Sequence, residues 1–168
     1  MRGWGGNMNN YAIINGKRVE LTDEQVAALG IKRVNPFERV ESNEYYYYVR
    51  NDGRVDVYTN ADDMVDKAIY AACNHFTDEA FAKQVALHQL LYRKLLKFAY
   101  DNECEDKEWN NTNEHWFIVY HPLNEDFIIG NVYCAKEHTV YFSTEEGASR
   151  AISEVIRPFM EEHPDFVW

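Results

Sequence analysis

Apolar and polar residues near the start of the chain predict a hairpin followed by a short helix. Two apolar residues precede Asn15-Gly16, and an Asn-Gly pair between apolar runs is a strong β-hairpin signal. Thr22 is followed three residues later by Gln25, which predicts a capping box at a helix start. Gly30 is expected to end that helix, because glycine readily adopts the left-handed conformation of a C′ residue. Residues 1–40 are therefore interpreted as an N-terminal hairpin-helix segment.

A second hairpin and a third strand are predicted next. Tyr45 to Val49 is rich in β-formers, Asn51 to Gly53 supplies a turn, and apolar and polar residues alternate from Val55. The apolar run that follows, AIYAACNHF, fits a helix or a strand. We predict a strand, because a new helix cap follows it at Thr77.

A long helix from Asp78 to Asn102 is marked by apolar residues at spacings of three and four. His88 and Tyr92 lie on the same stripe. The residues that we expect this helix to bury against a sheet are Phe81, Val85, Leu91, Leu95 and Phe98. The helix completes a first ββ-β-α unit over residues 41–104.

The rest of the chain repeats this order of elements. A hairpin is expected around Pro122 to Asn124, the run TVYF supplies a third strand, and a helix follows from Thr144. Ser143 is expected to cap that helix in a capping box with Glu146, and Pro158 is expected to kink or restart it. Residues 105–168 thus form a second ββ-β-α unit.

The fold class predicted from this order is α+β, with both units sharing one core. Two stretches with a similar sequence pattern begin the two main helices and suggest an internal duplication: HFTDEAFAKQVA and YFSTEEGASRAI. The alternative is that hairpins and caps are common patterns that recur by chance.

The charge of the chain is concentrated in its second part. The formal net charge is −11; residues 1–100 hold 13 acidic and 13 basic side chains, whereas residues 101–168 hold 15 acidic and 4 basic ones. This asymmetry argues against nucleic acid as the direct ligand, since a phosphate backbone attracts Lys and Arg. It is compatible with an acidic face that meets a basic groove on another protein; solubility alone is the alternative.

Residue types with catalytic or metal-binding chemistry are sparse. Two stretches contain zinc-ligand residue types, Cys73 with His75 and Cys134 with His138. Neither spacing matches a usual zinc knuckle. Glu145 and Glu146 are adjacent and so point apart on a helix, where the electrostatics of a helix N-terminus explain them better than catalysis does. We predict no catalytic residue, no metal site and no cofactor.

The chain is expected to be cytoplasmic. It has no run of about 18 apolar residues that would predict a membrane span. Its first ten residues lack the apolar region of a secretory signal. Its 3 cysteines, without motif spacing, indicate free thiols in a reducing compartment.

Aromatic residues are abundant, and tyrosine and tryptophan are the usual anchors of protein interfaces. Ordinary sheet packing is the alternative use for them. The acidic joint between the two units, with two aromatic residues beside it, is the predicted partner-binding site: Asp101, Glu103, Glu105, Asp106, Glu108, Trp109 and Trp116.

Several phrases of the sequence are familiar, among them EYYYYVRNDGRV, WNNTNEHWFIVYH and VYFSTEEGASRAI. With INGKRVELTDEQVAALGI, NPFERV and the long helix, they resemble small accessory proteins of phages and prophages of gut Firmicutes. The resemblance runs from about Tyr11 to the C-terminus and transfers no catalytic residue. It implies a mobile-element product acting inside a bacterial cell, a class that includes anti-CRISPR inhibitors.

The leading hypothesis is therefore a binding protein that inhibits a host nucleic-acid-handling enzyme, most directly a CRISPR effector nuclease. Its expected partner is a protein with a basic nucleic-acid-binding surface. The second hypothesis is a structural or regulatory phage protein that acts as a homodimer, with a strand such as Tyr45 to Val49 pairing edge to edge. The third is an enzyme with a zinc or thiol site.

Overall fold

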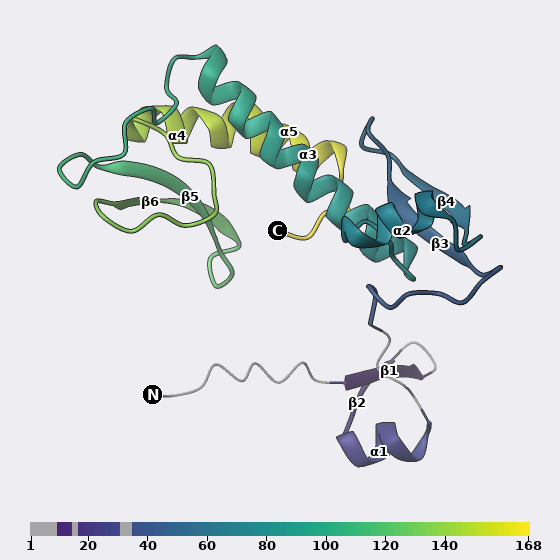
Figure 1. Cartoon of the computed structure of the whole chain (residues 1–168). Helices are drawn as coiled ribbons and strands as arrows, with labels where there is room; N and C mark the ends of the chain where they lie inside the picture. Colours follow the sequence, from purple (N-terminus) through teal and green to yellow (C-terminus); the bar gives the residue numbers. More distant parts are fainter. Residues whose placement is uncertain (1–9, 15–16, 31–34) are drawn as a thin grey trace.

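The computed structural model describes residues 10–14, 17–30 and 35–168, and it has the α+β class that the sequence predicts. Its elements in chain order are β1 (Asn10–Ile14), β2 (Lys17–Leu21), α1 (Asp23–Ala28), β3 (Tyr45–Val49), β4 (Val55–Thr59), α2 (Met64–Ala71), α3 (Glu79–Asp101), β5 (His115–His121), β6 (Asp126–Val132), α4 (Glu145–Ala151), the π-helical turn η1 (Ile152–Ile156) and α5 (Arg157–Glu162). The strands pair as three antiparallel hairpins, β1–β2, β3–β4 and β5–β6. Figure 1 shows α3 running between the β3–β4 hairpin at one end and the second unit at the other.

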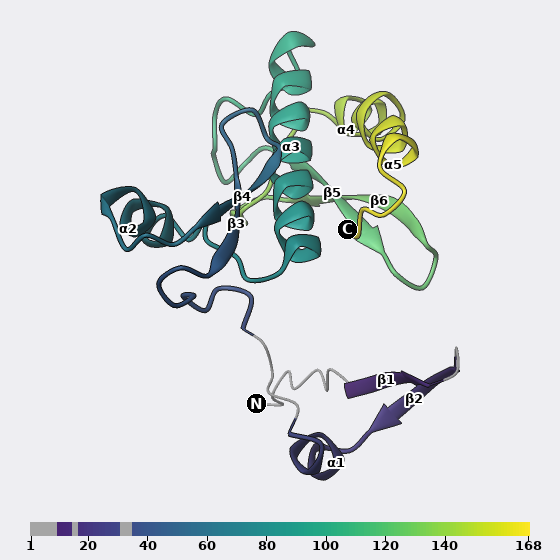
Figure 2. The same cartoon turned by 90° about the vertical axis from the view of Figure 1, so that its right-hand side faces the viewer.

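The N-terminal segment confirms its predicted hairpin and cap. β1 pairs with β2 across a turn whose residues, Asn15 and Gly16, lie outside the described part of the chain. Thr22 Oγ1 accepts the Gln25 N–H at 3.2 Å, and Gln25 Oε1 accepts the Thr22 N–H at 2.9 Å. Gly30 has φ +66°, the left-handed value expected after the helix. Figures 1 and 2 show this segment lying apart from the rest of the described chain.

The run AIYAACNHF, predicted as a strand, begins with the last four residues of the helix α2 and continues as a turn. Asp63 caps this helix: its Oδ1 accepts the N–H groups of Val65 at 2.7 Å and Asp66 at 3.0 Å. Asp66 Oδ2 in turn accepts the Asp63 N–H at 3.1 Å. Asp stands at both ends of this capping box, where Ser or Thr and Glu or Gln are usual. The strand prediction was wrong. The hydrogen bonds of the capping box start a helix at the polar residues before the run, and this helix extends into the run.

Each predicted third strand is reduced to one paired residue. Phe76 exchanges two backbone hydrogen bonds with Tyr47, both 2.8 Å long. Phe142 exchanges two with Trp116, at 3.0 and 2.7 Å. The run TVYF is therefore not a strand, since the chain reaches the edge of β5 only at Phe142 and then enters the cap of α4.

The caps of the two main helices lie one residue later than predicted. Asp78 Oδ1 accepts the Phe81 N–H at 2.6 Å, and Thr144 Oγ1 accepts the Gly147 N–H at 3.1 Å. Thr77 and Ser143 remain outside the helices, because their N–H groups donate to distant carbonyls, those of Pro36 and Cys104, both at 2.9 Å. The long helix itself is confirmed, with Asp78 and Asn102 as its caps.

The helix α3 is shared by two hydrophobic clusters. Its first half packs on the β3–β4 hairpin and its second half on the second unit. Leu91, Leu95 and Phe98 are buried as predicted, and Phe81 and Val85 are half-buried. The buried face turns along the helix, since the packing partner changes halfway.

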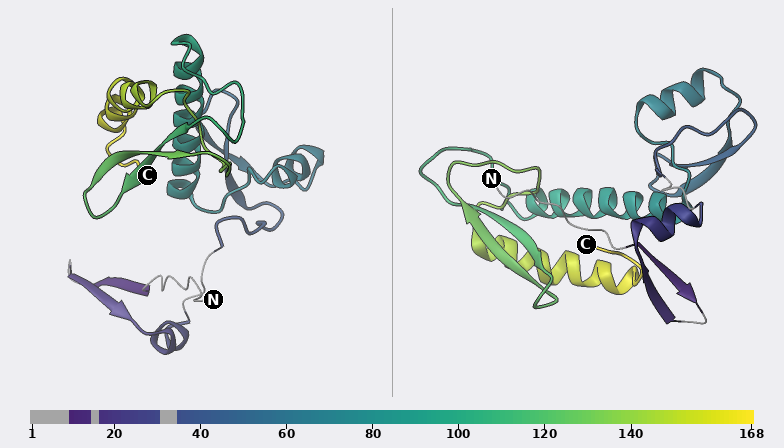
Figure 3. Two further views of the ribbon diagram at one scale, coloured as in Figure 1. Left: turned by 90° about the vertical axis from the view of Figure 1, so that its left-hand side faces the viewer. Right: turned by 90° about the horizontal axis from the view of Figure 1, so that it is seen from below.

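The same change of partner leaves His88 and Tyr92 exposed, although both lie on the predicted stripe. His88 packs at the boundary against Phe166, with ring centroids 4.8 Å apart. Figure 3 shows α3 beside α4 and α5, with the β5–β6 hairpin lying across the C-terminal helices.

Pro158, predicted to kink or restart the C-terminal helix, follows a change of helix type without a break in the helix. It occupies the first turn of α5, directly after the π-helical turn η1. A proline has no N–H to donate to the carbonyl four residues before it, and a π turn is one way in which a helix accommodates that loss.

The edge of β3 is closed at Tyr47 and Val49, which argues against it as the dimer edge of the second hypothesis. Tyr47 is paired with Phe76, and the Asn74 carboxamide takes the place of the next strand residue. Asn74 Oδ1 accepts the Val49 N–H and Asn74 Nδ2 donates to the Val49 carbonyl, both at 2.8 Å. The outward backbone groups of both strand residues are therefore used within the chain.

The two units share a hairpin, a one-residue bridge, a cap and a helix. They differ in that α2 stands between the hairpin and the bridge only in the first unit. The main helix of the first unit, α3, also supplies much of the core of the second. The internal duplication therefore stays a hypothesis.

A candidate partner-binding surface

The predicted acidic joint begins at the end of α3, where Glu103 takes a left-handed conformation. Its φ is +54°. The Glu103 N–H donates to the Tyr100 carbonyl at 3.3 Å, and the Cys104 N–H donates to the Ala99 carbonyl at 2.9 Å. These two bonds form a Schellman motif, in which glycine is the usual residue at the Glu103 position. Glu103 is exposed and makes no ion pair with any residue that the structure describes.

Asp101, at the last position of α3, is exposed and forms an ion pair with Lys97 one turn earlier. Such a pair on a helix surface reduces the local charge of the carboxylate only partly, because solvent screens it. Glu108, further along the joint, is also exposed.

Glu105 is held inside the fold instead of projecting from it. It is only 8% exposed and bridges to Phe142. Its carboxylate pairs with Lys107 at 2.8 Å, and this hydrogen bond holds the pKa of Glu105 below its usual range. The neighbouring Cys104 lies so close to Gly147 that a Cβ on that glycine would meet Cys104 Cβ at 2.9 Å. The joint therefore packs closely against the first turn of α4.

Asp106 is bound by a buried histidine. Its Oδ2 lies 2.6 Å from Nδ1 of His115, a side chain with no exposed surface, and His115 Nε2 lies 2.8 Å from the Asn110 carbonyl. The Asp106 carboxyl is thus held against a buried ring instead of projecting into solvent, and it contributes less to the outer acidic surface than Glu103 does.

Trp109 covers the His115 ring. Its ring stacks on His115 with centroids 3.8 Å apart, and Lys136 Nζ lies 5.0 Å from the Trp109 ring centroid. Tyr141 packs edge-on against the same ring at 4.9 Å. Trp109 is therefore already packed within the chain, and it supports the surface instead of projecting from it.

Trp116 lies in β5 and packs against the main core. With Asp106 it lines an open hollow of about 490 Å³ beside the joint. Glu114 and Tyr133 line the same hollow, and the Tyr133 hydroxyl donates to Glu114 Oε1 at 2.7 Å. The structure thus brings Asp106 and Trp116 together in one concave, polar place.

Three residues outside the predicted site adjoin its exposed part. Tyr100 precedes Asp101 and is 61% exposed. Glu145 and Glu146 are exposed in the first turn of α4, which packs on the joint. Tyr100 lies off the apolar stripe of α3. This position in the sequence could have indicated that its side chain is exposed. We call the group of Tyr100, Asp101, Glu103, Glu145 and Glu146 the acidic joint surface.

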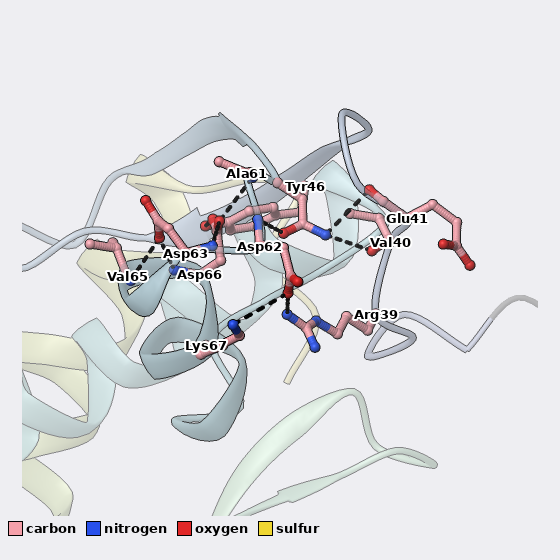
Figure 4. Close-up of polar contacts among 11 residues, drawn as sticks. Arg39, Val40, Glu41, Tyr46, Ala61, Asp62, Asp63, Val65, Asp66 and Lys67 are labelled. Atoms are coloured by element: carbon pink, nitrogen blue, oxygen red, sulfur yellow. Dashed lines mark hydrogen bonds and ion pairs between the residues drawn. The ribbon is translucent and has the colours of Figure 1, made fainter.

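The other dense group of polar contacts, drawn in Figure 4, holds α2 against the β3–β4 hairpin. Asp66 is buried; it accepts the Tyr46 hydroxyl and the Ala61 N–H, each at 2.8 Å. Burial raises the pKa of the Asp66 carboxyl, but the hydrogen bond from Tyr46 and those from backbone N–H groups outweigh it, so the pKa lies below the ordinary value. Arg39 and Lys67 pair with Asp62 at 2.6 and 3.8 Å on the exposed side of the group. These contacts have a structural role and occupy both oxygens of the Asp66 carboxylate.

The candidate zinc ligands do not converge. His75 stacks on Tyr46 with centroids 4.1 Å apart, and His138 stacks on Tyr92 at 6.0 Å. Cys73 and Cys134 are free and exposed. Within the described residues, no group of three or more His, Cys, Asp and Glu side chains is placed to hold a metal ion.

Comparison with protein families, curated proteins and solved structures finds no match to this chain. Among the helices described, none combines the length and the apolar character needed to cross a bilayer.

Proposed function

We propose that the chain is an acidic binding protein, derived from a phage or prophage, that inhibits a host nucleic-acid-handling enzyme in the bacterial cytoplasm. A CRISPR effector nuclease is the most direct candidate, because it holds nucleic acid in a positively charged channel. The observation that carries the proposal is the acidic joint surface, which combines four exposed carboxylates, at the end of α3 and in the first turn of α4 packed against the joint, with the exposed side chain of Tyr100.

The surface combines two contributions that binding proteins use. Exposed carboxylates accelerate the encounter with a basic groove, since electrostatic steering acts on the association rate. An exposed tyrosine offers a large contact area at a low cost in side-chain entropy. We expect Tyr100 to govern the lifetime of the complex and Glu103, Glu145 and Glu146 to govern its formation.

The structure changes which residues should be tested. Reversing the charge of Glu105 or Asp106 would disturb buried contacts with Phe142 and His115, so a loss of binding would be ambiguous. Glu103 and Glu145 are exposed and make no ion pair within the described chain. Their replacement by lysine tests steering without removing a packing contact.

The experiment measures cleavage by candidate effector nucleases with and without the protein, and the association rate for any nuclease that it inhibits. We expect the Glu103→Lys, Glu145→Lys double variant to associate about tenfold more slowly, within the range that interface variants span. Its association rate should also lose most of its salt dependence. The matched control is Glu161→Lys, which changes an exposed acid of α5. Equal association rates for all three proteins, or no binding to any nucleic-acid-handling enzyme, would contradict the proposal.

A further inference from the structure

The chain itself occupies part of the outer edge of each strand in the two main hairpins. Phe76 and Asn74 close β3, and Phe142 closes β5 at Trp116. On β4, the Val57 N–H is occupied by the Asp56 carboxylate at 2.9 Å. Such closures matter because an open edge offers a row of unpaired backbone groups to another strand.

The edge of β6 is closed at only one end. The pairing with β5 sets which backbone groups point away from the hairpin, namely those of Phe127, Ile129 and Asn131. The Phe127 N–H donates to Asp126 Oδ1 at 2.8 Å, and Arg157 binds the same carboxylate oxygen at 2.8 Å. In the described part of the chain, no hydrogen bond reaches the outward N–H or carbonyl of Ile129 or Asn131.

We propose that a second copy of this chain pairs with β6 along this open edge, antiparallel and across a two-fold axis through Gly130. In this register Ile129 of one copy faces Asn131 of the other, and the four outward residues exchange four backbone hydrogen bonds. The register does not use the Phe127 N–H that Asp126 occupies. The two hairpins then form one four-stranded sheet.

The side chains fit a second copy better than they fit a charged partner. Ile128, which is 42% exposed, lies opposite Val132 of the other copy, so two apolar pairs flank the axis. At the axis the two Gly130 residues let the backbones approach closely. The stretch from Phe127 to Tyr133 contains no charged residue, so no like charges face each other across the pair.

The pairing is expected to be weak and to strengthen with salt. The contact involves a few residues per copy, well below the roughly 1,200 Å² of standard interfaces. Each copy carries a net charge of −11, so the two copies repel at low salt, and screening relieves that repulsion. Binding of a basic partner to the acidic joint surface has the opposite salt dependence. The inference rests on no part of the proposed function.

The experiment is sedimentation velocity of the full chain over a range of concentrations in about 0.15 M and 1 M salt, conditions that differ strongly in screening. The variant Asn131→Pro removes the outward N–H without removing a bond to β5, and Asn131→Ala is its matched control. We expect wild type and Asn131→Ala to dimerise more in high salt and Asn131→Pro to stay monomeric. A wild type that is monomeric at about 1 mM in high salt overturns the proposal, as does an Asn131→Pro that dimerises normally.

Amide hydrogen exchange of the wild type gives an answer that does not depend on the folding of a variant. The amides of Ile129 and Asn131 should exchange more slowly as the protein concentration rises. Backbone amides that remain in contact with water should exchange at a rate that does not depend on concentration. Exchange that is independent of concentration overturns self-pairing. Protection that appears only on addition of a nuclease would assign the edge to that partner and also overturn it.

Discussion

Replacing Glu103 with glycine should stabilise the fold and at the same time weaken partner association. Glu103 occupies the left-handed C′ position of a Schellman motif, with φ +54°. A residue with a Cβ pays about 1–2 kcal/mol in this conformation. Glycine avoids that cost. Its greater conformational freedom in the unfolded chain reduces the resulting gain in stability by roughly 0.5–1 kcal/mol. The net gain in the free energy of unfolding is about 0.5–1 kcal/mol, which for a chain of this size raises Tm by about 1–4 °C.

Two controls separate the backbone from the charge. Glu103→Ala removes the carboxylate but keeps a Cβ in the left-handed conformation, so Tm should not rise. Cys73→Gly makes the same backbone change at the end of α2, where Cys73 has φ +53° in an equivalent motif. It should raise Tm without slowing partner association, whereas Glu103→Gly and Glu103→Ala should both slow it.

Thermal unfolding by circular dichroism and association kinetics measure the two effects on the same samples. If Glu103→Gly is no more stable than Glu103→Ala, the backbone at this position is not strained. A Glu103→Gly protein that associates as fast as wild type would mean that an acidic residue is kept there for another reason. A strained residue retained at a surface is expected where function requires its side chain.

Three further predictions concern stability, and chemical or thermal denaturation tests each of them. Leu95→Ala should lower the free energy of unfolding by about 2–5 kcal/mol, because Leu95 is buried in the main core; a negligible loss would mean that this face of α3 is not packed. Tyr46→Phe removes the hydroxyl that donates to buried Asp66 and should cost about 1–3 kcal/mol. Because the pKa of Asp66 is lowered in the fold, its contribution is complete above the ordinary value of about 3.9 and is lost as pH falls through the lowered value; a Tyr46→Phe variant with an unchanged acid-unfolding curve would contradict this. Asn74→Asp should destabilise the β3 edge by about 1–3 kcal/mol, since a carboxylate cannot donate to the Val49 carbonyl, and a neutral effect would show that the edge does not depend on Asn74.

Local signals predicted the elements that depend on neighbouring residues. The Thr22–Gln25 capping box, the turn at Gly53 and the long helix from Asp78 follow from patterns within a few positions, and the structure has all three. The signal for helix α2 is also local in sequence, but it was missed because Asp63 and Asp66 form a capping box of unusual composition. The joint after residue 100 was also identified from composition alone.

Which residues of the joint face the solvent was decided only by tertiary structure. Glu103 and Glu105 are two positions apart and look equivalent in sequence, yet one is exposed and the other bridges to Phe142. Asp106 and Trp109 are likewise drawn inward by the buried ring of His115. Composition locates charge along the chain, whereas the burial of a carboxylate depends on a cation, a backbone edge or a ring that folding brings to it, and the distances to those partners are properties of the folded chain.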